Sequence, residues 1–321
     1  MTTTENHAVD PGVETLGDLL PQGRQKKQQK IEKYIQYLLV GISSLTVFVL
    51  FGVVGALVPP TIEFFSDVSI TDFFGSTQWF PLFGDPKFGV WPLITGTFLI
   101  MFIAVLVAVP GGLAAAFFLN QYASDRVRRI LKPILEILAG VPTVVFGFFA
   151  LNFVSPKIVQ KVWPFGEVDY FNALSPGIVV GIMILPMMTT LAEDAMASVP
   201  RSLVDGAYAL GATKREVCTG VVLQAALSGI IAAVVISLSR AIGETTIVLL
   251  AAGATANFTF NPGEAVQTMA SFIGFAGIGD QPTGSTGYKT IFAVGSLLFV
   301  ITFLLNMLSI RIVRRFREIY E

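Results

Sequence analysis

The sequence predicts an all-α integral membrane protein with six transmembrane helices. Of its 321 residues, 53% are apolar and only 13% are charged, which is too apolar and too poor in charge for an ordinary soluble domain. Several apolar runs reach the roughly 20 residues that a helix needs to cross a hydrocarbon core about 30 Å thick. The alternating pattern of a membrane β-barrel is absent, so a helical bundle follows.

The apolar runs divide the chain into a tail and a membrane domain. Residues 1–30 are polar and lack periodicity, which predicts a disordered tail, and residues 31–321 form the membrane domain. The predicted spans cover residues 35–58, 91–119, 131–153, 173–195, 223–252 and 290–312. A polar loop, residues 196–220, separates the fourth span from the fifth.

Basic residues predict how the chain is oriented. Most of the 21 Lys and Arg residues fall on one side of the predicted spans. They are Arg24, Lys26, Lys27, Lys30, Lys33, Arg126, Arg128, Arg129, Lys132, Arg201, Lys214, Arg215, Arg311, Arg314, Arg315 and Arg317, against Lys87, Lys157, Lys161 and Lys289 on the other side. The positive-inside rule therefore places both termini and the 196–220 loop in the cytoplasm.

Composition also excludes several function classes. The net charge of −1 gives no general attraction for nucleic acid. Cys218 and His7 are the only residues of their types, so an internal disulfide and a cysteine-based metal cluster are excluded. The chain lacks a Gly-x-x-x-x-Gly-Lys-Ser/Thr phosphate loop, so we expect it not to bind ATP itself, and we expect no catalytic residues and no cofactor in this chain.

The stretch from Val199 to Val217 is a polar island between two long apolar segments. Pro200 suits the start of a helix, and Gly211, followed by Ala-Thr, suits a helix stop and restart. We therefore predict a short helix, a break and a second helix at the membrane surface. Such a hinged element is suited to docking on something outside the membrane.

Arg240 and Glu244 are charged residues within the predicted fifth span. Their spacing of four places them on one helix face, with Ser237 on the same side and Ser239 beside Arg240. Each charge costs roughly 2.5 to 3.5 kcal/mol near the bilayer centre. An exposed pair at this spacing returns only about 0.2 to 0.5 kcal/mol, so we prefer a pathway-lining site to a structural salt bridge. Two registers stay open, with Arg240 near the midplane or the pair toward the outer interface.

The two side chains suit a tetrahedral oxyanion. Arginine offers a planar fork of donors, and a carboxylate accepts a hydrogen bond from an anion that still carries a proton. Inorganic phosphate keeps such a proton at neutral pH, whereas sulfate does not. We therefore expect Glu244 to favour phosphate over sulfate.

Two groups of motifs carry a family resemblance. Asp205-Gly-Ala-x-x-x-Gly211 resembles the cytoplasmic EAA loop of bacterial ABC-importer permeases, although Asp-Gly replaces the usual Glu-Ala and Gln224 stands in place of a proline. Ser239-Arg-Ala-Ile-Gly-Glu-Thr245 and Glu193-Asp-Ala-Met resemble the phosphate-specific permeases. Phe88-Gly-Val-Trp-Pro-Leu-Ile-Thr-Gly-Thr97 is similar to their PstC-type subunit rather than to its PstA-type partner.

The resemblance implies the fold, the partners and the roles of several residues. It implies a type I ABC importer (MetI-like) permease in a bacterial cell membrane, paired with a PstA-type permease. It also implies two copies of a PstB-type subunit that binds ATP and Mg, and an extracytoplasmic PstS-type phosphate-binding protein. Docking and hinge roles fall on Asp205, Gly206, Ala207, Leu210 and Gly211.

Two alternatives stay open at this point. One is a permease for another oxyanion, such as sulfate, molybdate or phosphonate. The other is an ATP-independent carrier or channel. The outer connection from Pro59 to Val90, which is rich in aromatic residues, also has two interpretations, packing against the bundle or a position in the headgroup layer.

Overall fold

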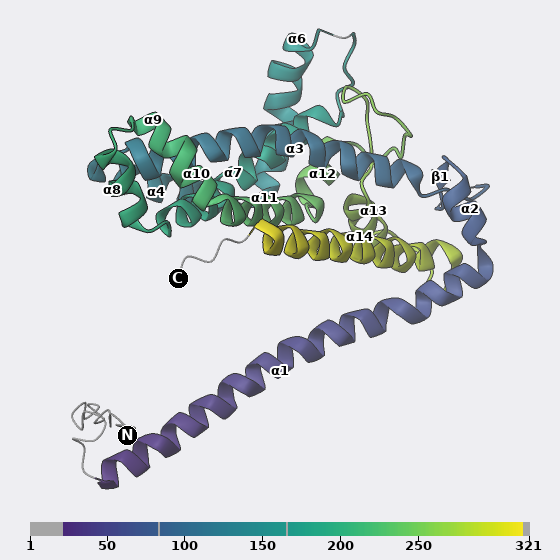
Figure 1. The fold of residues 1–321 in the computed structure, drawn as a ribbon. Helices are drawn as coiled ribbons and strands as arrows, with labels where there is room; N and C mark the ends of the chain where they lie inside the picture. The colour runs from purple at the N-terminus through teal and green to yellow at the C-terminus, as the bar shows by residue number, and fades with distance from the viewer. Residues whose placement is uncertain (1–21, 83, 165, 317–321) are drawn as a thin grey trace, which may run out of the picture. The chain divides into compact units, whose positions relative to one another are not determined.

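The computed structural model describes residues 22–82, 84–164 and 166–316 (Figure 1). Within these ranges the chain is mostly helical. Five helices are long and apolar enough to cross a membrane, or six if one bent pair counts as a single span. The predicted fold class, an all-α membrane protein, is confirmed.

The chain divides into two compact units, with residues up to Ala56 in the first and residues from Leu57 in the second. Helix α1 (Gln22–Asp67) contains an apolar stretch, Ile31–Asp67, that is long enough to be a span and includes the predicted one. The predicted tail is wrong for residues 22–30, which are helical because Gln, Lys and Arg are good helix formers. Its first 21 residues lie outside the described part of the chain.

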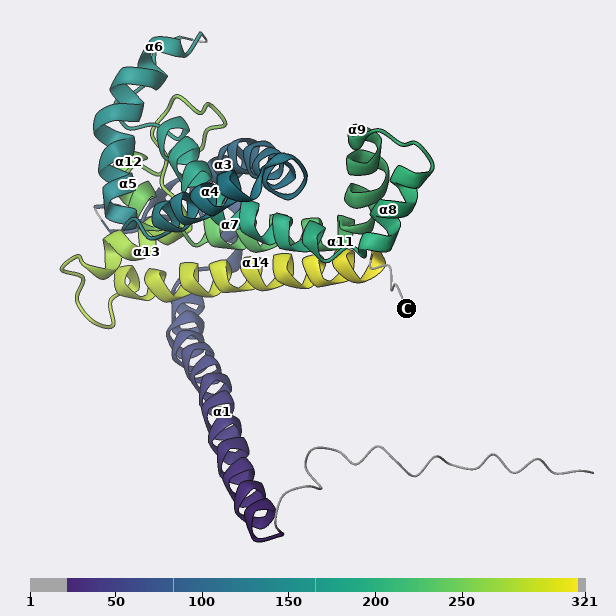
Figure 2. The same ribbon diagram turned by 90° about the vertical axis from the view of Figure 1, so that its left-hand side faces the viewer.

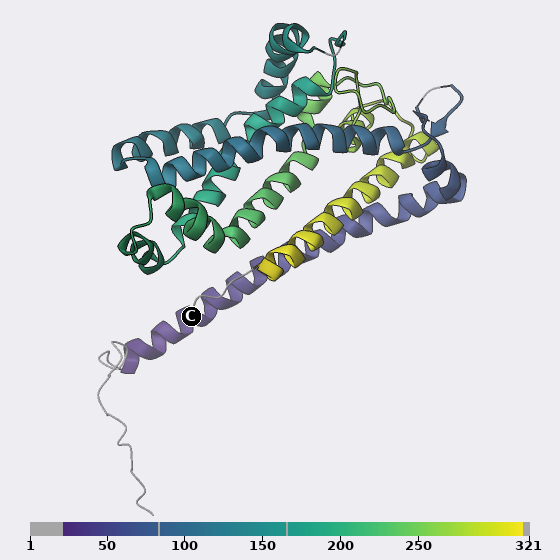
Figure 3. The same ribbon diagram turned by 45° about the horizontal axis from the view of Figure 1, so that its top comes forward.

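The second unit is a helical bundle with one short β-hairpin. Its elements are α2 (Ile70–Gly75), β1 (Trp79–Phe80), β2 (Lys87–Phe88), α3 (Trp91–Phe117), the π-helix η1 (Phe118–Tyr122), α4 (Asp125–Ala139), α5 (Thr143–Phe149), the π-helix η2 (Ala150–Val159), α6 (Gln160–Val162), α7 (Leu174–Ala197), α8 (Arg201–Ala209), α9 (Lys214–Glu216), the π-helix η3 (Val217–Val222), α10 (Leu223–Ala225), α11 (Leu227–Ile242), α12 (Thr246–Ala251), α13 (Met269–Gly277) and α14 (Thr286–Phe316). Helix α3 runs from the hairpin to α4 along the bundle (Figure 3). Helices α8 and α9 lie at the opposite end from α6 and α13 (Figure 2).

Glycines allow α3 and α7 to pack closely. A Cβ atom on Gly112 of α3 would lie 2.5 Å from Cγ of Met188, and one on Gly177 of α7 would lie 2.7 Å from Cβ of Ile103. Such distances are shorter than a carbon–carbon contact, so only glycine permits this approach. The small residues of these spans therefore serve close packing of the bundle.

The predicted third span, residues 131–153, is wrong. The chain forms α4 up to Ala139, breaks at Gly140 and restarts after Pro142, and the segment that is long enough to span is Thr143–Val162. Glycine at the end of one helix and proline before the next favour such a break. Helix α4 is instead amphipathic, with charged residues along one face.

The predicted fifth span, residues 223–252, is not one straight helix. The segment Lys214–Ala225 joins α11 at a bend of 71°. A second break, Gly243–Thr245, separates α11 from α12. Mean hydropathy over the whole segment stays high across both breaks, and hydropathy does not report the direction of a helix.

Aromatic residues of the outer connection pack inside the second unit. Phe64, Phe73, Trp79 and Phe272 are buried, and they meet in edge-to-face contacts with ring centroids 5.0 to 6.2 Å apart. This geometry is the one that aromatic pairs favour. The structure therefore supports packing against the bundle as the role of this segment.

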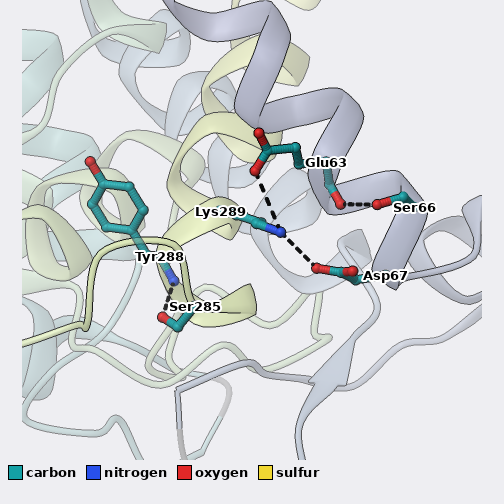
Figure 4. Close-up of polar contacts among 6 residues, drawn as sticks. All are labelled: Glu63, Ser66, Asp67, Ser285, Tyr288 and Lys289. Carbon is teal, nitrogen blue, oxygen red and sulfur yellow. Dashed lines mark hydrogen bonds and ion pairs between the residues drawn. The ribbon is translucent and has the colours of Figure 1, made fainter.

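An ion-pair cluster joins the C-terminal end of α1 to the start of α14 (Figure 4). Lys289 Nζ lies 2.9 Å from Asp67 Oδ2 and 3.5 Å from Glu63 Oε2. The ammonium group is largely covered, whereas both carboxylates are substantially exposed. All three residues belong to the second unit, and their pairing holds α14 beside the hairpin end of that unit.

Candidate functional site

Helix α8 and the turn after it form the predicted hinged element. Pro200 is the N-cap of α8 and Leu210 is its C-cap, and Gly211 follows with φ of +83°. Glycine suits this position because a side chain is strained in the left-handed region. The chain restarts at α9, where Thr213 and Glu216 form a capping box. The predicted helix, break and restart are confirmed.

The two faces of α8 differ. Val204 and Ala207 pack against the apolar cluster that includes Val217 and Val222. Asp205 is exposed on the opposite side, and Leu210 is 91% exposed at the tip of the turn. Asp205 and Leu210 therefore lie on the accessible side of this helix and turn.

Arg240 lies in the last turn of α11, immediately before the second break. The residue is exposed, and within the described part of the chain it makes no hydrogen bond or ion pair. Its guanidinium group therefore keeps all its donors available for a ligand or for another subunit.

Glu244 lies beyond the end of α11, so it does not share a helix face with Arg240. The prediction of a common face is wrong, because α11 ends at Ile242. Glu244 is only 4% exposed, and its Oε1 accepts hydrogen bonds from the backbone N–H groups of Thr246 (3.1 Å) and Ile247 (3.2 Å). The carboxylate thus caps α12, whose positive end favours a negative charge.

Ser237 and Ser239 point to different surroundings. Ser237 is buried, and its Oγ lies 3.7 Å from the sulfur of Met188. Ser239 Oγ lies 2.7 Å from Oδ1 of Asn306 on α14. The structure therefore separates the four residues predicted for the pathway, and it adds the exposed Asn306 beside Ser239.

A charged cluster around one buried carboxylate lies near the C-terminal end of α7, just before α8. The side chain of Glu193 is 1% exposed and pairs with two cations of α4. Arg128 donates a hydrogen bond to Glu193 Oε1, and Lys132 Nζ lies 2.5 Å from Oε2. We refer to Glu193, Arg128 and Lys132 as the α4–α7 ion cluster.

Sequence reasoning missed this cluster, although two signals were present. Arg128 and Lys132 are four residues apart and therefore share one face of α4. Glu193 is an acid at the end of an apolar run, where a buried position needs a partner. Removing the partners of a buried charge costs about 3 to 5 kcal/mol. The cluster therefore fixes α4 against α7.

A family model described as "Binding-protein-dependent transport system inner membrane component" matches residues 108–318. The match covers more than half of the chain and includes α4, α8 and α11. The chain belongs to this family of ABC transporter permeases.

Two curated relatives extend the family assignment. A probable ABC transporter permease protein, YqgH, from Bacillus subtilis is 36% identical over 242 residues, which are 75% of this chain and 77% of the relative. The phosphate transport system permease protein PstC from Xylella fastidiosa is 31% identical over 251 residues, and the match covers 72% of this chain and 75% of the relative.

A solved structure confirms the fold. A bacterial ABC transporter involved in the import of the acidic polysaccharide alginate has a TM-score of 0.64 at 16% identity, and the match covers 92% of this chain and 100% of that one. The type I importer permease fold is therefore confirmed. The protein is a membrane permease subunit of an ABC importer and not an enzyme, and its ATPase is a separate subunit.

Proposed function

We propose that this chain is the PstC-type permease subunit of an ATP-driven importer of inorganic phosphate. The observation that carries the proposal is Arg240, an exposed cation without a described partner at a break in an otherwise apolar segment. A charge in such a segment is expensive unless it serves a ligand or lines a pathway. The PstC relatives supply the substrate class, and arginine supplies the donors that a phosphate requires.

Glu244 has two roles in this proposal. Its Oε1 caps α12, and its Oε2 makes no hydrogen bond within the described residues. Oε2 is therefore the atom that accepts a hydrogen bond from a protonated phosphate. This acceptor favours phosphate over sulfate, because a fully deprotonated sulfate leaves it unpaired. Ser237 and Ser239 belong to the α11 segment that leads to this position.

Energy enters at α8 in the same proposal. Asp205, Gly206, Ala207, Leu210 and Gly211 form the docking face and hinge on which a PstB-type ATPase, loaded with ATP and Mg, acts. Closure of two such ATPases displaces α8 as a rigid element and changes the access of the pathway. A PstA-type permease completes the pathway, and a PstS-type binding protein delivers phosphate.

The distribution of basic residues supports one orientation. Arg128, Arg129 and Lys132 lie with α8 at one end of the second unit, whereas Lys289 lies at the hairpin end. We infer that the α8 end and both termini face the cytoplasm in a bacterial cell membrane. The hairpin end then faces the extracytoplasmic binding protein.

Reconstitution with the three partner subunits tests the substrate assignment. Proteoliposomes that contain the parent complex are expected to accumulate labelled phosphate when ATP is present, and excess sulfate, molybdate or phosphonate is expected not to compete. Uptake of one of those anions in place of phosphate would overturn the assignment. Accumulation that persists with an inactive ATPase would instead support an ATP-independent carrier.

Glu244→Gln tests the selectivity mechanism. Glutamine keeps an oxygen that accepts the two N–H bonds, so α12 stays capped, but the amide is a weaker acceptor and lacks the charge. We expect phosphate uptake to fall and the discrimination against sulfate to narrow. A variant that carries phosphate and rejects sulfate as well as the parent does would contradict this role.

A further inference from the structure

We propose that the α4–α7 ion cluster is the strut that transmits movement of α8 to the segment around Arg240. Glu193 is then a positioning residue for transport, because it acts through α4 rather than on the substrate. The inference rests on the proposed function only in that α8 is the element that the ATPase moves.

The first step is the connection between α8 and α4. Glu193 precedes α8 at the end of α7, and its buried carboxylate is held by Arg128 and Lys132. A displacement of α7 relative to α4 would leave this carboxylate buried without a partner. The pairing therefore makes α4 follow the end of α7 when α8 moves.

The second step leads from α4 to α5. Helix α4 ends at Ala139, and α5 begins after Pro142, so only a short break joins the two. Leu138 and Val141, on either side of Gly140, pack against the apolar cluster that contains Phe146 of α5. Because the break is short and packed, a displacement of α4 changes the position of α5.

The third step leads from α5 to α12. A Cβ atom on Gly147 of α5 would lie 2.6 Å from Cδ1 of Leu250 and 3.4 Å from Cα of Ile247. The two helices are thus in direct backbone-to-side-chain contact. Ile247 also donates its backbone N–H to Glu244, so movement of α12 reaches the break that follows Arg240.

These contacts form one continuous route from α8 to the break after Arg240. Each step is a packed contact or an ion pair between named elements, and the α4–α7 ion cluster is the one charged link among them. A substitution can remove the charge of this link without changing side-chain size. The ion cluster is therefore the step of the route that is best suited to a test.

The test measures phosphate moved per ATP hydrolysed in the reconstituted four-component complex. For Glu193→Gln we expect this ratio to fall about 2- to 30-fold, the range that corresponds to coupling energies of known residue networks. ATP hydrolysis should continue, because α8 is unchanged. The matched control is Arg129→Gln, since Arg129 is exposed and, among the described residues, its side chain bonds only to the carbonyl of Asp125 in its own helix.

Charge exchange separates positioning from simple stability. The triple variant Glu193→Arg with Arg128→Glu and Lys132→Glu exchanges all three charges of the cluster, so it keeps opposite charges in contact and should return the ratio toward the parent value. A purely structural role predicts that Glu193→Gln lowers the amount of complex and leaves phosphate per ATP unchanged. That result, or a ratio that is equally low in Arg129→Gln, would overturn the proposal.

Two milder variants serve if Glu193→Gln does not assemble. Arg128→Gln and Lys132→Gln each leave Glu193 with one cation, and each is expected to lower the ratio less than Glu193→Gln. An unchanged ratio of phosphate moved to ATP hydrolysed in both variants would overturn the proposal. Failure of the parent complex to move phosphate would instead count against the proposed function and not against the strut.

Discussion

Two regions of this permease hold charges in an apolar surrounding, and the regions differ in whether each charge has a partner. Near α8, the buried carboxylate of Glu193 is matched by Arg128 and Lys132. At the break after α11, Arg240 is exposed and has no partner within the described residues, while Glu244 uses one oxygen to cap α12.

The difference distinguishes a charge that is paired within the chain from a charge that is available to a ligand or to another subunit. A buried carboxylate with two cations gains its full electrostatic compensation inside the chain and fixes two helices together. An unpaired guanidinium group gains nothing from the chain, so its compensation must come from an anion or from another subunit. The first region is therefore expected to control stability and coupling, and the second to control transport.

The largest expected effect is on stability at the ion cluster. The double variant Arg128→Gln with Lys132→Gln leaves Glu193 buried without a counter-charge, which should lower the free energy of unfolding by about 3 to 5 kcal/mol. Arg240→Gln removes no described contact and should change it by less than about 0.5 kcal/mol. Thermal unfolding of the purified chain in detergent measures both. Equal losses in the two variants would erase the distinction between the regions.

A smaller effect is expected at the hinge of α8. Gly211→Ala forces a side chain into φ of +83°, which costs about 1 to 2 kcal/mol. The matched control is Gly220→Ala in η3, outside the docking face, where an added Cβ meets no atom within 4 Å and alanine favours the helix. We expect Gly211→Ala, but not the control variant, to bind the ATPase more weakly. Co-purification of the permease with the ATPase measures this binding. Equal binding by both variants would show that the turn geometry does not position the docking face.

The cap on α12 should contribute about 0.5 to 2 kcal/mol. Glu244→Ala removes the acceptor for the N–H groups of Thr246 and Ile247, whereas Glu244→Gln keeps it. Hydrogen exchange at these two amides is expected to accelerate in the alanine variant and to stay near the parent rate in the glutamine variant. Similar exchange in all three proteins would mean that the carboxylate does not cap the helix.

The smallest effect is expected at the contact between α11 and α14. Asn306→Leu removes the hydrogen bond to Ser239, and such bonds between membrane helices contribute about 0.6 kcal/mol on average. The unfolding midpoint should fall slightly, and Ser239→Ala should add nothing further in the double variant. Additive losses would show that the two side chains act independently.

Sequence patterns predicted the elements better than their directions. Hydropathy located the apolar segments, and Pro200 and Gly211 predicted the helix, break and restart around α8. Hydropathy could not separate α4 from α5, because the short break from Gly140 to Pro142 adds no charged residue between their apolar residues. Hydropathy also could not detect the 71° bend before α11, since an alanine-rich run does not indicate a change in the direction of the helix axis.

The candidate site was predicted in part for the same reason. Arg240 and Glu244 were identified from their charge, but their common face depended on an unbroken helix, and α11 ends between them. The partnership of Glu193 with α4 required knowledge of which helices are neighbours. Spacing within one helix predicts contacts along that helix and not contacts between helices.

ATP-driven phosphate uptake by Arg240→Gln tests the central claim most directly. Loss of charge-assisted hydrogen bonds worth about 1.5 to 3 kcal/mol predicts uptake about 10- to 150-fold below the parent, per assembled complex and with an unchanged unfolding midpoint. Arg240→Lys should retain part of the activity, because a cation remains. Uptake equal to that of the parent in Arg240→Gln would contradict the assignment of Arg240 to the phosphate pathway.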